Sequence, residues 1–452
     1  MNSAAVEHVS ECFIKPKYEV EESKHPYHLG PWDLVMLSVH YIQKGLLFAK
    51  PNPHSEYSIE KLLESLKESL SITLVHFYPL AGRLATQADE DRHECLVFID
   101  PNKGPGARFI HATLHMTMSD ILSPTDVPLV VQSLFDHDRA VNHDGHTSPL
   151  LTVQVTELLD GIFIGVSINH AVVDGTSYWH FWNTWSEIHR STTDGKQISI
   201  SNPPIHKLWI PEGYGPTLRL PFTHADEFIS RYEAPPLRER IFHFSSESIA
   251  RLKGKANEES NTNKISSFQA LSALVWRSII RANGLPHNQV TNCRLAVNNR
   301  HRLDPPLPQS YFGNSINPMK TTTTVAELLG HSLGWAALLL NQSVANHSNS
   351  SICNFVNGWL ESRHVYQLRT LFDSNSVMMG SSPRFDMYGN EFGLGKAVAV
   401  RSGYANKFVG KVTAYPGHEG GGSVDLEICL PPESMRALES DDEFMAAVSF
   451  PV

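Results

Sequence analysis

Cysteine is scarce in this sequence, and no two cysteines form a CxxC pair. The 452 residues include five, at Cys12, Cys95, Cys293, Cys353 and Cys429. They lie far apart, and an odd number leaves one unpaired whatever the pairing. This pattern is typical of a reducing compartment, so we predict a cytoplasmic protein.

Long apolar runs and an excess of positive charge are also missing. No run approaches the roughly 20 apolar residues that a membrane span needs. The acidic N-terminal segment has neither the apolar core of a signal peptide nor the basic character of a transit peptide. The formal net charge of -10 gives no general attraction to nucleic acid or to anionic lipid. We therefore expect no nucleic acid and no membrane among the partners, and an anionic ligand would need a local basic pocket.

Internal repeats and the glycine fingerprints of P-loop or dinucleotide-binding proteins are absent from the sequence. Hydrophobic residues make up 41% of the chain and aromatic residues 9%, which indicates a globular protein and excludes a disordered one. A length of 452 residues exceeds what one hydrophobic core usually organises. We therefore expect two domains.

Helix and strand patterns alternate in the first half of the chain. An amphipathic helix starts at Ile59, and residues 94–100 and 150–168 are rich in β-branched residues that predict strands. The dipeptide Asp160–Gly161 predicts a hairpin turn within the second of these runs. The helix places five leucines on one face: Leu62, Leu63, Leu66, Leu70 and Leu74.

The same alternation restarts after an irregular segment. Residues 201–240 are rich in proline and aromatic side chains and follow neither period, which is typical of a crossover between domains. Beyond it, helices are predicted over 265–282 and 325–342, with a strand over 293–297 and a strand-rich end after residue 396. The pattern predicts an α/β fold with mixed sheets.

A histidine stands where an apolar strand ends, in the stretch IFIGVSINHAVVDG. Asp174 follows His170 within one turn, and Gly175 permits a sharp change of direction. An unperturbed imidazole titrates near about 6.5, so it can take a proton from a hydroxyl or an amine at neutral pH and return it. His170 is therefore the candidate general base.

Asp174 has two candidate roles. It can orient His170 as in a hydrolase triad, or it can be a structural anion that holds the turn. We favour the structural role, because side chains four positions apart in a tight turn need not converge on one proton. The basic cluster 298–302, at the end of a predicted strand, is the candidate source of a cation, and a bidentate arginine suits a carboxylate.

The motif HAVVDG, from His170, resembles the HxxxD motif of the plant BAHD acyltransferases. Five other segments follow in the order of that family: HFYPLAGRL from His76, PLLTVQVTEL from Pro149, ISSFQALSALVWR from Ile265, VNNRHRLDPPLPQSYFGN from Val297 and YGNEFGLGK from Tyr388. The resemblance covers essentially the whole chain. It implies two chloramphenicol-acetyltransferase-like domains, 1–205 and 241–452, joined by a long crossover at 206–240. It also implies a solvent channel centred on His170 and an ion pair between Asp174 and Arg300.

The same resemblance implies an enzyme that moves an acyl group from a coenzyme A thioester to the hydroxyl or amine of a plant specialised metabolite. His170 deprotonates this acceptor, and no covalent enzyme intermediate is needed. Acyl-CoA is then a co-substrate, and no cofactor is bound permanently. We expect acyl-CoA and a small-molecule acceptor as the only partners of a monomer.

Two further sets of binding residues are implied by position in the family. Lys264, Ser266 and Ser267 match a segment that lies along the coenzyme, and their place at a helix N-terminus suits an anion. Tyr41 and Gln43 fall near residues that line the acceptor pocket, although half-buried packing is an equal alternative for both.

The sequence departs from the family in its second motif, DFGWG. Glu391 and Leu394 replace the aspartate and tryptophan of that motif, whose role in the family is structural support of the site. Drift in a remote loop explains this change, and the alternatives are changed chemistry, such as that of a lyase, or a binder without catalysis. The retained His170 favours transfer. The segment 381–384 also differs, which leaves the oxyanion donors unassigned.

Two other motifs indicate different classes of protein. Residues 330–334, GHSLG, fit the GxSxG motif of serine hydrolases, but helical spacing runs through them and predicts that Ser332 lies inside a helix. Asp136, His137 and Asp138, with residues 143–146, match no zinc-binding spacing. We therefore interpret this second stretch as a surface loop and predict no metal site.

Overall fold

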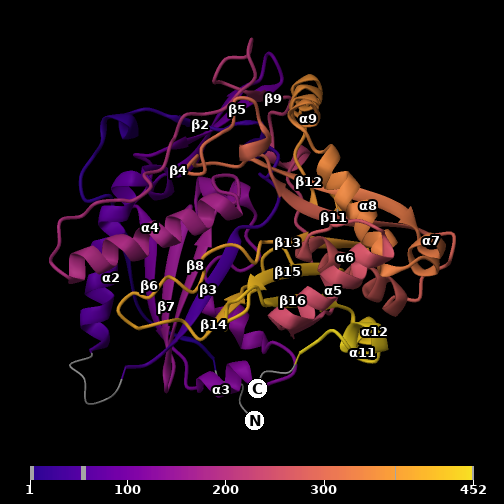
Figure 1. Cartoon of the computed structure of the whole chain (residues 1–452). Helices are drawn as coiled ribbons and strands as arrows, with labels where there is room; N and C mark the ends of the chain where they lie inside the picture. The colour runs from indigo at the N-terminus through magenta and orange to yellow at the C-terminus, as the bar shows by residue number, and fades with distance from the viewer. Residues whose placement is uncertain (1–4, 52–57, 372, 450–452) are drawn as a thin grey trace.

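Two six-stranded mixed sheets organise the chain in this computed structural model, which describes residues 5–51, 58–371 and 373–449 (Figure 1). In the first sheet β6 and β7 are parallel, and the other neighbours are antiparallel. The predicted mixed α/β architecture is confirmed. The first sheet has the order β1 (Glu7–Ile14), β6 (Ala107–Thr113), β7 (Leu151–Glu157), β8 (Gly161–Ile168), β3 (Ile42–Ala49), β14 (Ala399–Ser402).

The second sheet is built from the later part of the chain. Its central strands β11, β13 and β15 run parallel to one another, and its outer pairs are antiparallel. A small third sheet has the order β2 (Tyr27–His28), β5 (Glu94–Asp100), β4 (Arg83–Asp89), with β9 (Arg219–Leu220) also paired to β5. The second sheet has the order β10 (Arg238–Phe244), β16 (Val424–Leu430), β15 (Lys411–Pro416), β13 (Ser376–Gly380), β11 (Val290–Asn298), β12 (Ile316–Thr324).

Two long helices cover the first sheet, α2 (Ile59–His76) and α4 (Gly175–Thr193) (Figure 1). The five leucines predicted to share one face of α2 are all buried, which confirms the amphipathic pattern. Shorter helices complete this part: α1 (Pro31–Leu34) and α3 (Met118–Leu122).

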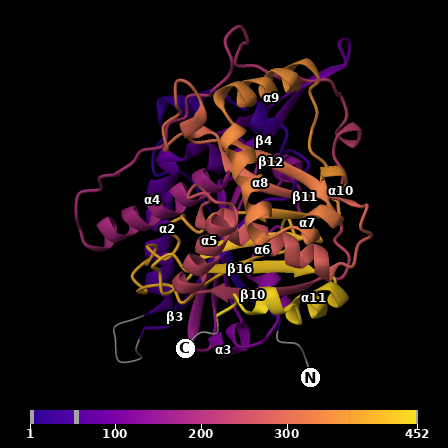
Figure 2. The ribbon, with the colours of Figure 1, turned by 45° about the vertical axis from the view of Figure 1, so that its right-hand side comes forward.

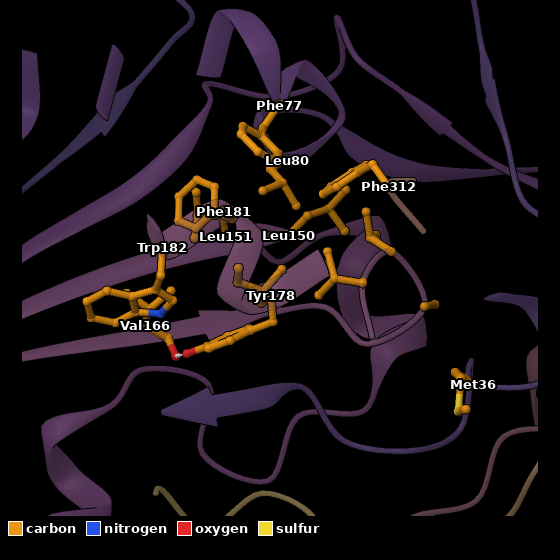
Figure 3. Packing of buried hydrophobic residues seen from close by; sticks show 14 of the residues in the cluster. Met36, Phe77, Leu80, Leu150, Leu151, Val166, Tyr178, Phe181, Trp182 and Phe312 are labelled. Carbon is orange, nitrogen blue, oxygen red and sulfur yellow. Dashed lines mark hydrogen bonds between the residues drawn. The ribbon is translucent and has the colours of Figure 1, made fainter. Parts of the chain in front are cut away.

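Aromatic side chains of α4 fill the core above the first sheet (Figure 3). Trp182 and Tyr178 are fully buried, and the Tyr178 hydroxyl donates to the carbonyl of Val166 at 2.9 Å. Burial of such large side chains stabilises the fold by about 1.5–3 kcal/mol each. Phe312, from the second half of the chain, lies edge-on to Phe77 with ring centroids 5.3 Å apart. The second half therefore contributes to the core of the first.

Most helices of the second half pack together and against the second sheet (Figure 2), whereas helical residues 349–361 and 368–371 contribute to the core of the first half. The helix predicted over 265–282 is α6, and its cap explains where it begins. Ser266 accepts a hydrogen bond from the backbone N–H of Gln269, and the Gln269 side chain accepts one from the backbone N–H of Ser266. The remaining helices are α5 (Ser246–Glu259), α6 (Ser267–Ala282), α7 (Val325–Gly330), α8 (Leu333–Asn346), α9 (Asn349–Glu361), α10 (Leu368–Leu371), α11 (Pro432–Glu439) and α12 (Asp442–Met445).

The prediction of one helix over 325–342 is wrong, because the chain breaks between α7 and α8 at His331 and Ser332. The buried guanidinium of Arg277 donates to the carbonyls of Leu328 and His331, which a continuous helix would use internally. Ser332 then caps α8 by accepting from the backbone N–H of Trp335. Ser332 is therefore an exposed N-cap and not a residue inside a helix.

One strand connects the two halves in a way that the sequence did not predict. β14 lies beyond residue 240, yet it pairs with β3 as the edge strand of the first sheet, with Val400 opposite Leu46. The irregular segment 201–240 contains only β9 and a short 3₁₀ turn before β10 begins at Arg238. A boundary at 240 therefore does not separate the two sheets completely, and the division into 1–205, 206–240 and 241–452 stays a prediction.

A buried ion pair joins the two halves. Asp174, at the N-cap of α4, and Arg300, after β11, are both fully buried, and Arg300 donates to the two carboxylate oxygens at 2.7 and 3.1 Å. The carboxylate also accepts from the backbone N–H groups of Ser177 and Ser315, each at 2.9 Å. The bidentate pair that the sequence predicts is therefore present, and hydrogen bonds from both halves satisfy it.

Replacement of Asp174 by asparagine should destabilise the protein. The new amide would keep an N-cap oxygen but would leave the buried guanidinium of Arg300 without its counter-charge, which costs about 3–5 kcal/mol. We expect a lower urea midpoint, followed by tryptophan fluorescence. The control Asp91→Asn removes an exposed carboxylate and should change stability by no more than about 0.5 kcal/mol. Equal midpoints for the two variants would count against the ion pair as a major stabilising contact.

Candidate active site

Two asparagines fix the backbone of His170 just beyond the end of β8. The backbone N–H of His170 donates to Oδ1 of Asn142 at 2.7 Å, and its carbonyl accepts from Nδ2 of Asn314 at 2.8 Å. Asn142 belongs to the first half of the chain and Asn314 to the second. The position of the imidazole therefore depends on contacts from both halves.

A network of buried amides extends these contacts. Asn169 donates to the carbonyl of Asn142 at 2.7 Å, and the side chain and backbone N–H of Asn314 both donate to Asp33, each at 2.9 Å. Burial raises the pKa of Asp33 to about 6, although these hydrogen bonds oppose the shift. The sequence did not identify these residues, because each is an ordinary polar side chain until the fold brings them together.

The imidazole of His170 lines the cavity and leaves one nitrogen available. Its Nδ1 is buried and forms no hydrogen bond of good geometry within the described part of the chain. The other ring nitrogen, Nε2, is therefore the one open to the cavity. Burial lowers the pKa of His170 below the usual 6.5, and the nearby carbonyls of His170 and Val173 oppose this shift only partly. The ring is accordingly neutral at pH 7 and has a lone pair for proton abstraction.

The cavity around His170 has a volume of about 740 Å³ and is lined by both halves of the chain. Strand β3 and helix α4 supply one side, and strands β11, β13 and β15 supply the other. A space of this size lies within the usual range for small-molecule sites. Representative lining residues are Thr176, Trp179, Asn298, Gln309, Met378 and Phe385.

Asp174 makes its hydrogen bonds away from His170, although its negative charge partly opposes the lowering of the imidazole pKa. Its carboxylate accepts from Arg300, Ser177 and Ser315, and no hydrogen bond joins it to the imidazole in the described residues. The arrangement therefore lacks the carboxylate partner of a hydrolase triad. Ser332, the other half of the hydrolase hypothesis, caps α8 and does not line the cavity.

The predicted coenzyme residues are only partly at the cavity. Ser266 lines it from the N-cap of α6, but Lys264 and Ser267 are not among the lining residues, and Lys264 is exposed. His301 and Arg302 line the cavity as well. Any basic contribution from Lys264 would therefore come from outside the cavity.

The acceptor-pocket prediction fails for Tyr41. This side chain is fully buried away from the cavity, stacks on His137 at 4.6 Å between ring centroids, and donates to the carbonyl of Pro149 at 3.1 Å. Tyr41 precedes β3, and these two contacts hold its ring and hydroxyl within the first half of the chain. Gln43 does line the cavity, but its amide donates to the carbonyl of Asp136 at 2.7 Å and accepts from the backbone of Ala405 at 3.1 Å.

The prediction that Glu391 supports the site is also wrong for its side chain, which is exposed and has no ion pair among the described residues. Phe392 holds this loop instead, with its ring 4.6 Å from Trp185 and 5.8 Å from Trp182, both on α4. Asn390 adds a hydrogen bond to Asn183 of the same helix at 3.0 Å. The loop therefore contacts α4 through aromatic packing and an amide hydrogen bond. The sequence analysis did not predict either contact.

The loop 136–146 is less superficial than predicted. Asn142 is fully buried, and the side chain of His137 is almost so, with its Nε2 2.8 Å from the Thr152 hydroxyl. Asp144 pairs with Arg231 at 2.7 Å. Across the described ranges no group of three or more histidine, cysteine or acidic side chains is arranged to hold a metal.

Charged side chains that the sequence did not identify also line the cavity. One is Lys44, on β3, and another is Lys407, between β14 and β15. The others are Lys411 on β15 and Glu427 on β16. The available signal was a charged residue within an apolar strand, as in VDLEICL around Glu427. Such a residue is ambiguous until the fold shows which face of the sheet it occupies.

The sequence and the fold both match known proteins. A family model described as the Transferase family matches residues 4–445. An uncharacterized acetyltransferase of Arabidopsis thaliana is 36% identical and covers 98% of this chain and 99% of its own length. The BAHD acyltransferase DCR of Arabidopsis thaliana is 34% identical, over 97% of this chain and 92% of its own.

A solved structure supports the fold. The crystal structure of F. sporotrichioides TRI101 complexed with coenzyme A and T-2 superposes with a TM-score of 0.73, over 94% of this chain and 99% of that one, at 18% identity. No helix in the described ranges is both long enough and apolar enough to cross a bilayer. The family match over nearly the whole chain, together with relatives above 30% identity, shows that the protein belongs to the Transferase family of BAHD acyltransferases.

Proposed function

We propose that the protein transfers an acyl group from a coenzyme A thioester to the hydroxyl or amine of a small plant metabolite. Nε2 of His170 is the general base in this proposal. The observation that carries it is a neutral, cavity-facing imidazole whose backbone is fixed by Asn142 and Asn314. A neutral imidazole suits proton abstraction from an alcohol or amine.

The reaction needs no covalent enzyme intermediate. His170 takes the proton of the acceptor as its oxygen or nitrogen attacks the thioester carbonyl. The tetrahedral intermediate then expels the coenzyme A thiolate, and the imidazolium returns its proton to that sulfur. Base catalysis contributes roughly 10²- to 10⁴-fold, so the placement of both substrates in one cavity supplies much of the remainder.

The N-terminus of α6 is the candidate coenzyme contact in this proposal. Ser266 at the cavity, with Lys264 and Ser267 beside it, is the candidate contact for the coenzyme arm, because the N-terminus of α6 favours negative charge. The TRI101 structure was solved with coenzyme A bound, which supports acyl-CoA as the co-substrate. We further propose a cytoplasmic monomer without a permanently bound cofactor, and all five cysteines are free thiols, which suits a reducing compartment.

Two alternatives use the same cavity. A lyase or a small-molecule binder without catalysis would have the same fold. The changed motif at Glu391 and Leu394 is the feature that suggests them. Because the Glu391 side chain is exposed and Phe392 still packs on α4, the change leaves the support of the site in place. Incubation with several acyl-CoAs and a plant metabolite extract, followed by a search for new acylated masses, distinguishes transfer from both alternatives.

Substitution of His170 by alanine should remove the base and preserve the fold. We expect acyl transfer to fall by at least about 100-fold, the low end of general-base contributions. The new masses formed with wild-type protein should disappear, while the melting temperature stays within a few degrees. His170→Gln provides a larger polar control. Near-full activity in either folded variant would refute the proposed base.

The pH dependence follows from the lowered pKa of His170. The working form is neutral, and burial shifts the pKa below 6.5, so kcat/KM should rise with pH along an acid limb whose midpoint lies below 6.5. The rate constant should gain nothing further from this group above about pH 7. Measurement over about pH 5 to 8 checks this, with the residual activity of His170→Ala as the control. An acid limb that persists in that variant would assign it to another group.

Ser332→Ala separates acyl transfer from serine hydrolysis. Because Ser332 caps α8 outside the cavity, we expect transfer to survive and stability to fall by about 1 kcal/mol. Ser332→Asp retains a capping oxygen and should restore the stability. Abolished activity in folded Ser332→Ala would instead support the hydrolase hypothesis.

A further inference from the structure

Three lysines and one glutamate meet at the cavity although the protein as a whole is negatively charged. Lys44 comes from β3 of the first sheet, Lys411 and Glu427 come from β15 and β16 of the second, and Lys407 precedes β15. We refer to these four residues as the lysine cluster. Its members differ in how far other protein groups already satisfy their charge.

Lys407 is fully occupied by protein carboxylates. Its ammonium pairs with Glu239, and it lies 3.6 Å from an oxygen of Glu427. These charges raise the pKa of Lys407 above its ordinary value. Lys407 therefore has a structural role, and it neutralises the two acids.

Glu427 is likewise committed to the protein. In addition to Lys407, its carboxylate accepts from the Ser402 hydroxyl at 2.5 Å and from the Tyr415 hydroxyl at 3.3 Å. The nearby Arg401 is a further buried cation, and its guanidinium donates to the carbonyl of Val400. Glu427 therefore has little capacity left for the other two lysines.

Lys411 makes no ion pair with a carboxylate of the described residues, although the charge of Glu427 acts on it from a distance. Within the described residues its ammonium forms no hydrogen bond and no ion pair, and it lies over the ring of Phe408 at 5.9 Å from the centroid. The backbone makes room for it at Gly380, where a Cβ atom would come within 2.1 Å of the Lys411 nitrogen. A glycine at this point thus lets a cation approach the cavity.

Lys44 is nearly as free. Its ammonium donates to the Tyr415 hydroxyl at 3.2 Å and lies over the same ring, but no carboxylate of the described chain pairs with it. Burial lowers the pKa of Lys44 to about 7 and that of Lys411 to about 8. Both shifts indicate that burial destabilises these ammonium groups, and a bound anion would relieve this effect.

We propose that Lys44 and Lys411 bind the carboxylate of a substrate, so that the cavity selects a carboxylate-bearing small molecule. The two acids of the region are already paired with Lys407, which leaves two ammonium groups for one external anion. A carboxylate offers acceptor oxygens to both. This inference rests on the proposed function and adds to it the chemical class of the substrate.

The carboxylate has two possible sources, the acceptor or the transferred acyl group. An acceptor arm therefore compares para-hydroxybenzoate, para-coumarate and mandelate with their methyl esters. An acyl arm compares malonyl-CoA with acetyl-CoA, and succinyl-CoA with butanoyl-CoA. Binding is measured by calorimetry for all of them, which needs no turnover, and kcat/KM is measured for pairs that react.

Wild-type protein should bind at least one acid more tightly than its neutral counterpart, by roughly tenfold or more, as expected for hydrogen bonds to a charged group. Lys411→Met should reduce that preference at least about fivefold, and Lys44→Met should reduce it as well. The matched control Lys320→Met removes an exposed lysine of the same sheet and should retain the preference. Lys44→Met keeps the test valid if Lys411→Met does not fold.

The inference is overturned if no acid in either arm is preferred over its neutral partner, or if the preference persists in both folded lysine variants. Preference for an acid without any transfer would leave this inference standing and would refute the proposed acyltransferase. Acyl transfer without a preference for acids would support the proposed acyltransferase and refute the carboxylate site.

Discussion

The fully buried pair of Asp174 and Arg300 is the constraint on which the site depends. It links the N-cap of α4 to the chain after β11, and its carboxylate also holds the backbone at Ser315. The preceding residue, Asn314, donates to the carbonyl of His170. Because an unpaired buried charge costs several kcal/mol, the pair favours one relative position of the two halves. That position creates the cavity.

Burial has opposite consequences for the charged groups around this cavity. It disfavours the proton on His170 and so maintains a neutral base. It also lowers the pKa values of Lys44 and Lys411, which form no ion pair within the described part of the chain, whereas Lys407 remains charged beside Glu239 and Glu427. The same low-polarity environment thus favours proton abstraction at one point and the binding of an external anion at another.

Local patterns in the sequence predicted much of the fold. The leucine face of α2, the hairpin at Asp160–Gly161 and the capped start of α6 depend on neighbours in the chain, and all three are present. The failures have a common physical cause. Arg277 on α6 binds carbonyls at the end of α7, Tyr41 is held by His137 and Pro149, and the contact of the Glu391 loop is made by Phe392. Each depends on a partner distant in sequence.

The sequence by itself determined the alternation of helices and strands, the family, the histidine and its nearby aspartate, because these are properties of local spacing and motif order. Only the tertiary structure decided that β14 completes the first sheet and that Asn142 and Asn314 hold His170. It alone also brought Lys44 and Lys411 to one cavity from different sheets. The free energy of a buried charge depends on which groups surround it in space, and spacing along the chain does not contain that information.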